Sequence, residues 1–304
     1  MSDVKLFKIA KTDVQEIQGS SLSLEKSLQS LIEKHLEAFL SVKFLASEFT
    51  TDAAHGGRMD TFGIDENFCP VIIEYKRTTN ENVINQGLFY LDWLMHHRKD
   101  FEWLVMEKLG KDAALSIEWG SPRLICIAGD FTKYDEHAVK QINRNIELIR
   151  YKKYGDDLLM LDLVNASTAT VSSVVSENGT GENSRRGKTV SEYLEDASTE
   201  IKDLFEALKD FLIGLGDDVQ IKTLKNYIAF RRFKNFACVE VHNRNKHLTV
   251  FVDVDPDAVT LEAGFTRDVR EVGHFGTGKL EIIIQSNDDL TKAKALIEKS
   301  YEAS

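Results

Sequence analysis

The chain has 304 residues, of which 42% are hydrophobic and 29% are charged, and this length is typical of two domains. Its 38 Lys and Arg residues stand against 49 Asp and Glu residues, so the net charge is −11. This balance excludes a protein that holds nucleic acid through its overall charge. A polyanionic partner would therefore need a local basic patch.

Membrane and disulfide-bonded classes are also disfavoured. No apolar run approaches the roughly 20 residues of a membrane-spanning helix, and residues 1–15 lack the apolar core of a signal peptide. The three cysteines, Cys69, Cys126 and Cys238, lie far apart and form neither a metal-binding spacing nor a disulfide framework. We expect a cytoplasmic protein without a membrane role.

Residues 166–190 are dominated by Ser, Thr, Gly and Asn and contain no aromatic residue. Such a segment cannot bury enough surface to offset its ordering entropy, so it predicts a flexible linker between domains 1–165 and 191–304. By count, the first domain carries 20 basic and 26 acidic side chains, and the second carries 15 and 21. Neither domain is basic overall.

The first domain alternates helical and strand-like segments. Apolar residues at helical spacing predict a first helix through Leu22, Leu24, Leu28, Leu31, Ile32, Leu36 and Phe39. Strands are predicted over 58–64 and 70–77, with a turn at 65–69. A helix over 82–98, a buried strand over 123–128, a helix over 132–149 and a strand over 157–164 follow. The alternation predicts an α/β sheet that helices cover on both faces.

The second domain is predicted to be smaller and α+β. Helices are expected near 191–213 and 217–230, strands at about 236–242, 247–253 and 279–285, and a closing helix from about 288 to 301. Residues 273–279 (GHFGTGK) match most of a phosphate-binding loop, but Leu280 stands where Ser or Thr is needed. We interpret them as a glycine-rich turn between strands.

The most informative pattern is Asp60 followed by Glu74-Tyr75-Lys76. Side chains alternate along a strand, so Glu74 and Lys76 point to one face and Tyr75 to the other. Hairpin pairing of the two strands would place the Asp60 carboxylate beside that of Glu74. Adjacent carboxylates repel each other unless a cation lies between them, and hard oxygen ligands select Mg²⁺ or Mn²⁺.

Such a site suits phosphodiester hydrolysis, because the metal offsets phosphate charge and lowers the pKa of bound water. Lys76 would position that water or stabilise developing negative charge. Gln86 and Tyr90 share one face of the next helix, where Gln86 could orient the lysine or the water and Tyr90 could contact a nucleic-acid backbone. The alternative is a solvated edge strand, but the apolar run 71–73 favours a core strand.

These residues carry a family resemblance. Asp60, Glu74-Tyr75-Lys76 and residues 86–90 (QGLFY) resemble the motifs of the PD-(D/E)XK nuclease superfamily, and the Gln-x3-Tyr element resembles its RecB-type and NucS-like branches. Residues 57–77 and 82–98 resemble a group of uncharacterised bacterial proteins in that superfamily. The resemblance covers about residues 20–165. Met59 stands where the name of the motif has proline.

The resemblance implies a restriction-endonuclease-like mixed sheet flanked by helices, with the metal at a hairpin of two central strands. It implies Asp60 and Glu74 as metal ligands, joined by the carbonyl of Tyr75, and Lys76 as the catalytic lysine. The superfamily often adds a glutamate on its first helix; Glu25 and Glu33 are both candidates, and we favour Glu25. A homodimer is implied in the same way. The second domain resembles a recurrent bacterial domain of unknown function.

The second domain also contains a basic run with interleaved aromatic residues. Its candidate nucleic-acid contacts are Lys222, Lys225, Arg231, Arg232 and Lys234. Basic residues between aromatic ones can follow a backbone and stack on bases. In the alternative interpretation the aromatic residues belong to the core and the basic ones to a solvated helix face.

We therefore expect a Mg²⁺- or Mn²⁺-dependent nuclease that hydrolyses phosphodiester bonds in DNA, with a second domain that binds nucleic acid or a partner. The alternative is a non-catalytic nucleic-acid- or protein-binding module on a nuclease fold, because a fold alone does not determine function. Metal binding that depends on Asp60 distinguishes the two hypotheses.

Overall fold

The computed structural model describes residues 4–21, 25–52, 56–76, 83–167 and 188–304. The chain divides into two compact units, Met1–Ala169 and Thr170–Ser304, each with its own hydrophobic core. Most of the segment predicted as a linker, residues 168–187, lies outside the described residues. At its ends, residues 166–167 belong to the last strand of the first unit and Val190 begins the first helix of the second.

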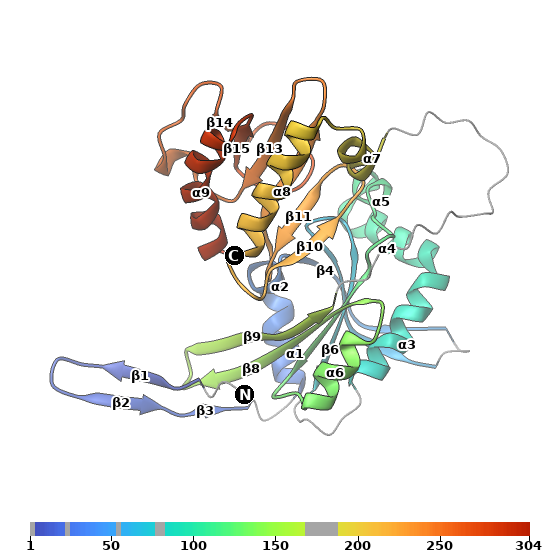
Figure 1. Ribbon diagram of the computed structural model, residues 1–304. Helices are drawn as coiled ribbons and strands as arrows, with labels where there is room; N and C mark the ends of the chain where they lie inside the picture. The colour runs from blue at the N-terminus through green and yellow to red at the C-terminus, as the bar shows by residue number, and fades with distance from the viewer. Residues whose placement is uncertain (1–3, 22–24, 53–55, 77–82, 168–187) are drawn as a thin grey trace. The chain divides into compact units, whose positions relative to one another are not determined.

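The first unit is built on a mixed sheet with strand order β3-β8-β7-β6-β5-β4, to which β9 is added by pairing with β8. A ribbon of two further strands, β1 and β2, extends from this unit (Figure 1). The strands are β1 (Leu6–Ile9), β2 (Val14–Ile17), β3 (Gly19–Ser20), β4 (Val42–Thr50), β5 (Arg58–Asp65), β6 (Pro70–Lys76), β7 (Arg123–Ala128), β8 (Asn145–Tyr154) and β9 (Leu158–Ser167). Strands β4 to β6 are antiparallel, whereas β7 and β8 run parallel to β6.

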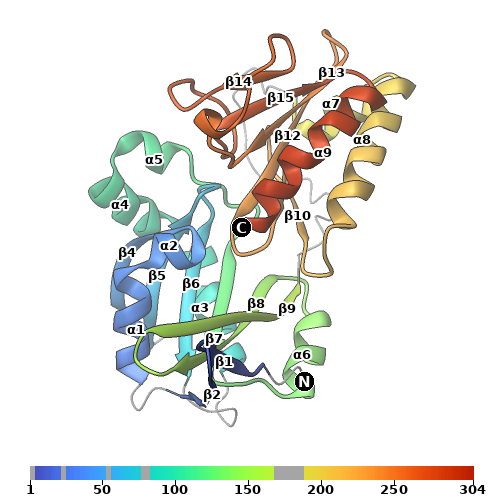
Figure 2. The ribbon, with the colours of Figure 1, turned by 90° about the vertical axis from the view of Figure 1, so that its left-hand side faces the viewer.

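Helices cover both faces of this sheet (Figures 1 and 2). They are α1 (Glu25–Lys34), α2 (Leu36–Leu40), α3 (Val83–His96), α4 (Arg98–Leu109), α5 (Lys111–Leu115) and α6 (Lys133–Lys140). Helices α3, α4 and α6 share one core cluster with the sheet residues Ile72, Leu124 and Leu148. Helix α1 packs on the other face, with Leu28 and Ile32 fully buried. The mixed α/β class predicted from the sequence is confirmed.

Two predicted helices of the first unit differ from the structure. The first is divided at His35 into α1 and α2, and residues 22–24 lie outside the described part. The predicted helix 132–149 is wrong beyond Lys140, because residues 145–149 belong to strand β8. There Ile146 and Leu148 face the core cluster while Glu147 points to the other face, which is the two-residue period of a strand. Strand β4 was not predicted.

A buried ion-pair triad ties three strands together at the end of the sheet where β7 begins. The guanidinium of Arg123 donates to both carboxylate oxygens of Glu147, at 2.8 and 2.9 Å, and to Asp65 Oδ2 at 3.0 Å. The other oxygen of Asp65 accepts the backbone N–H groups of Asn67 and Cys69, which form the turn between β5 and β6. All three charged side chains are at most 2% exposed as residues. The triad therefore fixes both the hairpin turn and the alignment of β5 with β7 and β8.

The second unit is a six-stranded antiparallel sheet with the order β10-β11-β12-β13-β15-β14. Its strands are β10 (Gln220–Thr223), β11 (Ile228–Arg231), β12 (Asn235–His242), β13 (His247–Val252), β14 (Thr266–Asp268) and β15 (Leu280–Ile284). Its helices are α7 (Val190–Glu195), α8 (Thr199–Ile213), the short η1 (Pro256–Ala258) and α9 (Asn287–Glu302). Helices α8 and α9 lie on one face of the sheet (Figure 2), where they enclose the core.

The predicted helix 217–230 is wrong, because this segment forms β10 and β11. Ile228 and Phe230 face the core while Ala229 is buried on the other side, so the apolar residues follow a strand period that the neighbouring lysines obscure. The predicted helix 191–213 is interrupted between Glu195 and Thr199. None of the helices in the described part of the chain combines the length and apolar character that crossing a bilayer requires.

The buried triad leads to a stability prediction. We expect Arg123→Ala to lower the free energy of unfolding of the first unit by about 3–5 kcal/mol, because two buried carboxylates would lose their partner. The three tryptophans, Trp93, Trp103 and Trp119, all lie in the first unit, so their fluorescence during urea unfolding measures this unit alone. The control is Lys153→Ala, which removes a solvent-exposed pair with Asp156 and should cost at most about 1 kcal/mol. An equal loss in both variants would contradict the assigned role of the triad.

Candidate active site

The pairing of β5 with β6 brings Asp60 and Glu74 together. The ladder ends with Thr61 opposite Ile73, and the next residues on the two strands are Asp60 and Glu74. Glu74 Oε1 accepts the backbone N–H of Asp60 at 3.2 Å, and Asp60 Oδ2 accepts the backbone N–H of Tyr75 at 3.0 Å. Each carboxylate thus takes the position of a ladder carbonyl, and the two acidic groups are held side by side.

Burial makes this pair electrostatically costly. Glu74 is fully buried, and its Oε2 has no hydrogen-bond partner. Burial raises the pKa of Glu74 to about 9, and the neighbouring Asp60 carboxylate adds to the shift. Burial also raises the pKa of Asp60, although the Tyr75 N–H and the charge of Lys76 act in the opposite direction. Two anions are therefore disfavoured here unless a proton or another cation joins them.

Lys76 belongs to the same cluster. Its side chain is only 14% exposed, and its ammonium donates to Glu25 Oε1 at 3.1 Å. Glu25 is the first residue of α1, so the beginning of this helix lies beside the end of β6. The alternative first-helix candidate, Glu33, instead accepts the Thr61 hydroxyl at 2.7 Å. The structure therefore brings Glu25 rather than Glu33 to Lys76.

Tyr90 and Gln86 lie on α3 and contact each other, with Gln86 Nε2 donating to the Tyr90 hydroxyl at 3.3 Å. Tyr90 is only 5% exposed, and its hydroxyl accepts the backbone N–H of Arg58 at 3.1 Å. Tyr90 is thus packed inside the unit and supports the start of β5, and its contact with a nucleic-acid backbone stays a prediction. Gln86 is half-buried beside it, and its predicted role toward the lysine or water stays a prediction.

Two polar residues near the pair were not identified from the sequence. Gln29 is 3% exposed, and its amide donates to the backbone carbonyl of Asp60 at 2.7 Å. Glu48 has a left-handed φ of 54° and pairs with Lys26 and Arg58, each at 2.6 Å. The available signal was the position of Gln29 on the apolar face of α1, between Leu28 and Ile32. Glu48 gave no such signal, because its partners are distant in sequence.

The basic run of the second unit does not form one exposed surface. Lys222 and Arg231 are 5% and 2% exposed, so their side chains are buried. Arg232 and Lys234 pair with Asp218 and Asp253, at 2.7 and 3.5 Å. Of the five candidate nucleic-acid contacts, only Lys225 has a largely exposed side chain. Most of these cations are thus buried or paired, and their contact with nucleic acid stays a prediction.

Within the described residues, no three His, Cys, Asp or Glu side chains are gathered closely enough to hold a metal ion by themselves. The pair at the end of β5 and β6 consists of two carboxylates, with the backbone of Tyr75 directly beside them. A divalent ion held there would keep water in its remaining coordination positions. Mg²⁺ commonly does so when one or two carboxylates bind it.

Comparisons with known proteins give a partial classification. Residues 190–304 match the family described as "Domain of unknown function (DUF5655)", in keeping with the resemblance noted for the second domain. An uncharacterised protein from Haemophilus influenzae is 27% identical over 306 residues, covering 98% of this chain and all of the relative. A repair endonuclease from Pyrococcus abyssi and the EndoMS–dsDNA2 complex are each 18% identical over 43% of this chain, with TM-scores of 0.29 and 0.25. Each of these two likenesses spans about half of the solved chain and is weak.

The buried pair predicts a pH-dependent stability. In metal-free buffer, Glu74→Gln should raise the free energy of unfolding of the first unit by about 1–3 kcal/mol at pH 8.5, because the amide is neutral at every pH whereas the wild type must take up a proton on Glu74 when it folds. Between the ordinary pKa of 4.5 and the folded value of about 9, only the folded wild type binds the Glu74 proton. Wild-type stability therefore falls as pH rises through this window, and the advantage of the variant should shrink near pH 5.

Tryptophan fluorescence during urea unfolding in EDTA measures this difference. The matched control is Glu107→Gln, which removes the same charge from the exposed face of α4 and should change little at either pH. A Glu74→Gln variant that is less stable than wild type at pH 8.5 would show that the carboxylate is accommodated without cost.

Proposed function

We propose that the first unit is a Mg²⁺- or Mn²⁺-dependent nuclease that hydrolyses phosphodiester bonds of DNA. The observation that carries the proposal is the meeting of Asp60, Glu74 and Lys76 where the β5–β6 pairing ends, with one buried Glu74 oxygen that has no protein partner. A mixed sheet with helices on both faces and an inner β5–β6 hairpin supports the restriction-endonuclease-like core that the motif resemblance implies.

The residues of this cluster fit a divalent cation. A carboxylate that is fully buried, that faces a second carboxylate and that keeps one oxygen without a hydrogen bond needs a compensating positive charge. Oxygen ligands of this kind suit Mg²⁺ and Mn²⁺. Asp60 and Glu74 would hold the ion, with the backbone carbonyl of Tyr75 as a further oxygen ligand.

The other residues of this cluster each have a separate role in the proposed reaction. When bound, the ion supplies charge neutralisation at the scissile phosphate and a lowered pKa for water. Lys76 donates hydrogen bonds to the attacking water or to the phosphate oxygen on which charge develops. Glu25 holds the lysine ammonium in place at 3.1 Å. Gln29 positions Asp60 through its backbone carbonyl, so it acts on the site indirectly.

Two cations beside the cluster are suited to contact the DNA backbone. Lys26 follows Glu25 on α1, and Arg58 precedes Asp60 by two residues on β5; their side chains are 60% and 65% exposed. Both are paired with Glu48, whose charge also acts on Asp60. Phosphate oxygens can replace the Glu48 carboxylate as their partner, because guanidinium and ammonium groups bind both kinds of anion.

The central test is cleavage by Lys76→Ala. We expect its activity on plasmid, linear duplex or single-stranded DNA to fall at least about 100-fold in Mg²⁺ or Mn²⁺, because the developing charge loses a donor. RNA serves as a comparison substrate, and EDTA and Glu74→Ala are the negative controls. Lys140→Ala, at the exposed end of α6, is the matched lysine control and should cleave like wild type. Full cleavage by Lys76→Ala would refute the assignment.

Calorimetry with Mn²⁺ separates the nuclease from a non-catalytic module. Under the nuclease proposal, Mn²⁺ binds and the heat of binding is lost in Asp60→Asn. A metal-independent protein that still binds DNA would favour the binding module.

The proposed backbone contacts predict a change in binding rather than in chemistry. The double variant Lys26→Gln/Arg58→Gln should raise KM roughly tenfold and weaken its salt dependence, with kcat nearly unchanged, because each cation contributes a charge-assisted contact to phosphate. The matched control is Lys43→Gln/Arg144→Gln, which removes two exposed cations elsewhere in the unit. A loss confined to kcat would place Lys26 and Arg58 in the chemical step instead.

A further inference from the structure

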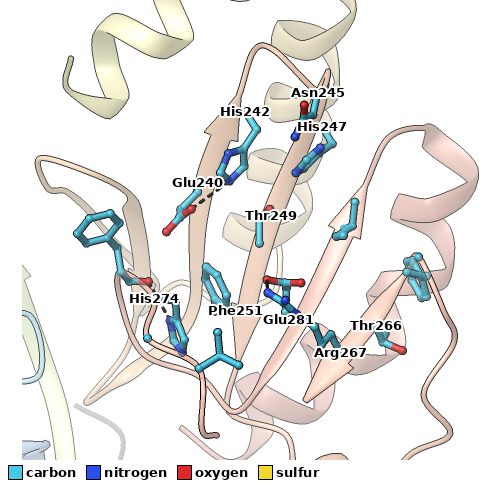
Figure 3. A pocket seen from close by; sticks show the side chains of 16 residues that line it. Glu240, His242, Asn245, His247, Thr249, Phe251, Thr266, Arg267, His274 and Glu281 are labelled. Carbon is cyan, nitrogen blue, oxygen red and sulfur yellow. Dashed lines mark hydrogen bonds and ion pairs between the residues drawn. The ribbon is translucent and has the colours of Figure 1, made fainter. Parts of the chain in front are cut away.

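The sheet of the second unit has a pocket on the face opposite α8 and α9. Its floor is formed by strands β12, β13 and β15, and one side by β14 and residues 264–275 (Figure 3). The cavity measures about 540 Å³, which is within the range of small-ligand sites. The core-forming side chains point the other way, toward the helices. The polar side chains in the pocket are therefore not required by the packing of the core.

A threonine at the centre of the floor has an unused hydroxyl. Thr249 is 4% exposed and lies directly opposite Glu240 on the neighbouring strand. Over the described part of the chain its hydroxyl makes no hydrogen bond, although it lines the cavity (Figure 3). Because it lines the cavity, this hydroxyl is available to hydrogen-bond a ligand that binds at the floor.

The two ends of the pocket each carry a nearly buried carboxylate, but among the described residues only Glu281 is paired with Lys or Arg. Glu281 accepts a guanidinium N–H of Arg267 at 2.6 Å. Glu240, whose side chain is 14% exposed, contacts the His242 ring at 3.0 Å through one of its two oxygens. No Lys or Arg among the described residues pairs with Glu240. At Glu281 the carboxylate binds a guanidinium group of this chain. At Glu240 the carboxylate is available to bind such a group from a ligand.

The surroundings of Glu240 suit a positively charged group. Burial, followed by the neighbouring His242, lowers the pKa of His247, so the charged form that would repel a cation is disfavoured. Along one wall, the Phe251 and His274 rings are stacked at 4.2 Å. The exposed Val272 and Phe275 lie at the rim and can cover an alkyl chain. At the Glu240 end a phosphate would face a carboxylate that has no Lys or Arg partner among the described residues, so an anionic ligand is disfavoured there.

We propose that this pocket binds the guanidinium or ammonium group of an organic cation, with Glu240 as its counter-ion and the Thr249 hydroxyl as an additional acceptor. The same chemistry is found in a free alkylguanidine or alkylamine and in the basic side chain of a peptide. The site is separate from the proposed nuclease centre, and its binding does not depend on DNA cleavage.

Calorimetric titration of the full chain at low salt tests the proposal. The two cationic probes are agmatine, which is a free alkylguanidine, and N-acetyl-arginine amide, which resembles a peptide side chain. Inorganic phosphate and Zn²⁺ are titrated separately to test whether the pocket instead binds an anion or a metal ion. We expect at least one cationic probe to bind, with Glu240→Gln weakening it at least fivefold. Thr249→Val keeps the side-chain shape and should weaken binding by a smaller factor. Glu298→Gln removes a matched charge from the exposed face of α9 and should bind like wild type.

The outcomes separate the possibilities. Tighter binding of agmatine supports a free small cation, and tighter binding of N-acetyl-arginine amide supports a basic peptide side chain. The proposal is overturned if neither probe binds, if Glu240→Gln binds as well as wild type, or if phosphate or Zn²⁺ binds more tightly in a Glu240-dependent way. Circular dichroism melting shows whether Glu240→Gln is folded; if it is not, unchanged binding by a folded Thr249→Val overturns the proposal.

Discussion

The candidate site of the first unit depends on two acidic side chains that lie side by side where the pairing of β5 with β6 ends. Asp60 and Glu74 occupy facing positions, and each carboxylate accepts a backbone N–H from the other strand. These hydrogen bonds fix the carboxylates in space, but they do not remove the repulsion between them. The backbone therefore holds the two carboxylates together although they repel each other. A cation bound between them would relieve this repulsion, so its binding would be strongly favourable.

Such an arrangement needs a rigid frame. At the far end of the hairpin, Asp65 closes the turn and accepts from Arg123, so a one-residue slip of β5 would break a buried ion pair. Near the carboxylates, Gln29 from α1 and Tyr90 from α3 bind the backbone of β5 from two helices. The strand is thus held at both ends by polar contacts of low exposure, whose loss would leave buried groups unpaired.

Local patterns predicted the two strands of the candidate site but not the residues that support them. The apolar run before Glu74 identified β6, and the two-residue period correctly placed Glu74 and Lys76 on one face. Gln29 was missed because its partner, Asp60, is 31 residues away, and such a contact exists only after α1 has packed on the sheet. Segment 217–230 was predicted as a helix because lysines interrupt a strand alternation. Helical spacing correctly placed Gln86 and Tyr90 on one face of α3, but it could not predict that Tyr90 packs inside the unit.

The two units share an acidic composition. Both are acidic, so a long-range field would repel a nucleic acid from either one. In the first unit, the exposed Lys26 and Arg58 already share the Glu48 carboxylate, so under the proposed function a phosphate backbone would exchange one anion for another. In the second unit, the partly buried Glu240 has no Lys or Arg partner among the described residues, so the proposed organic cation would bind there without displacing one. Although both units are acidic, the proposed ligand of the first unit is an anion and that of the second is a cation. The difference arises because the charged side chains that can bind a ligand are set by local ion pairing and not by net charge.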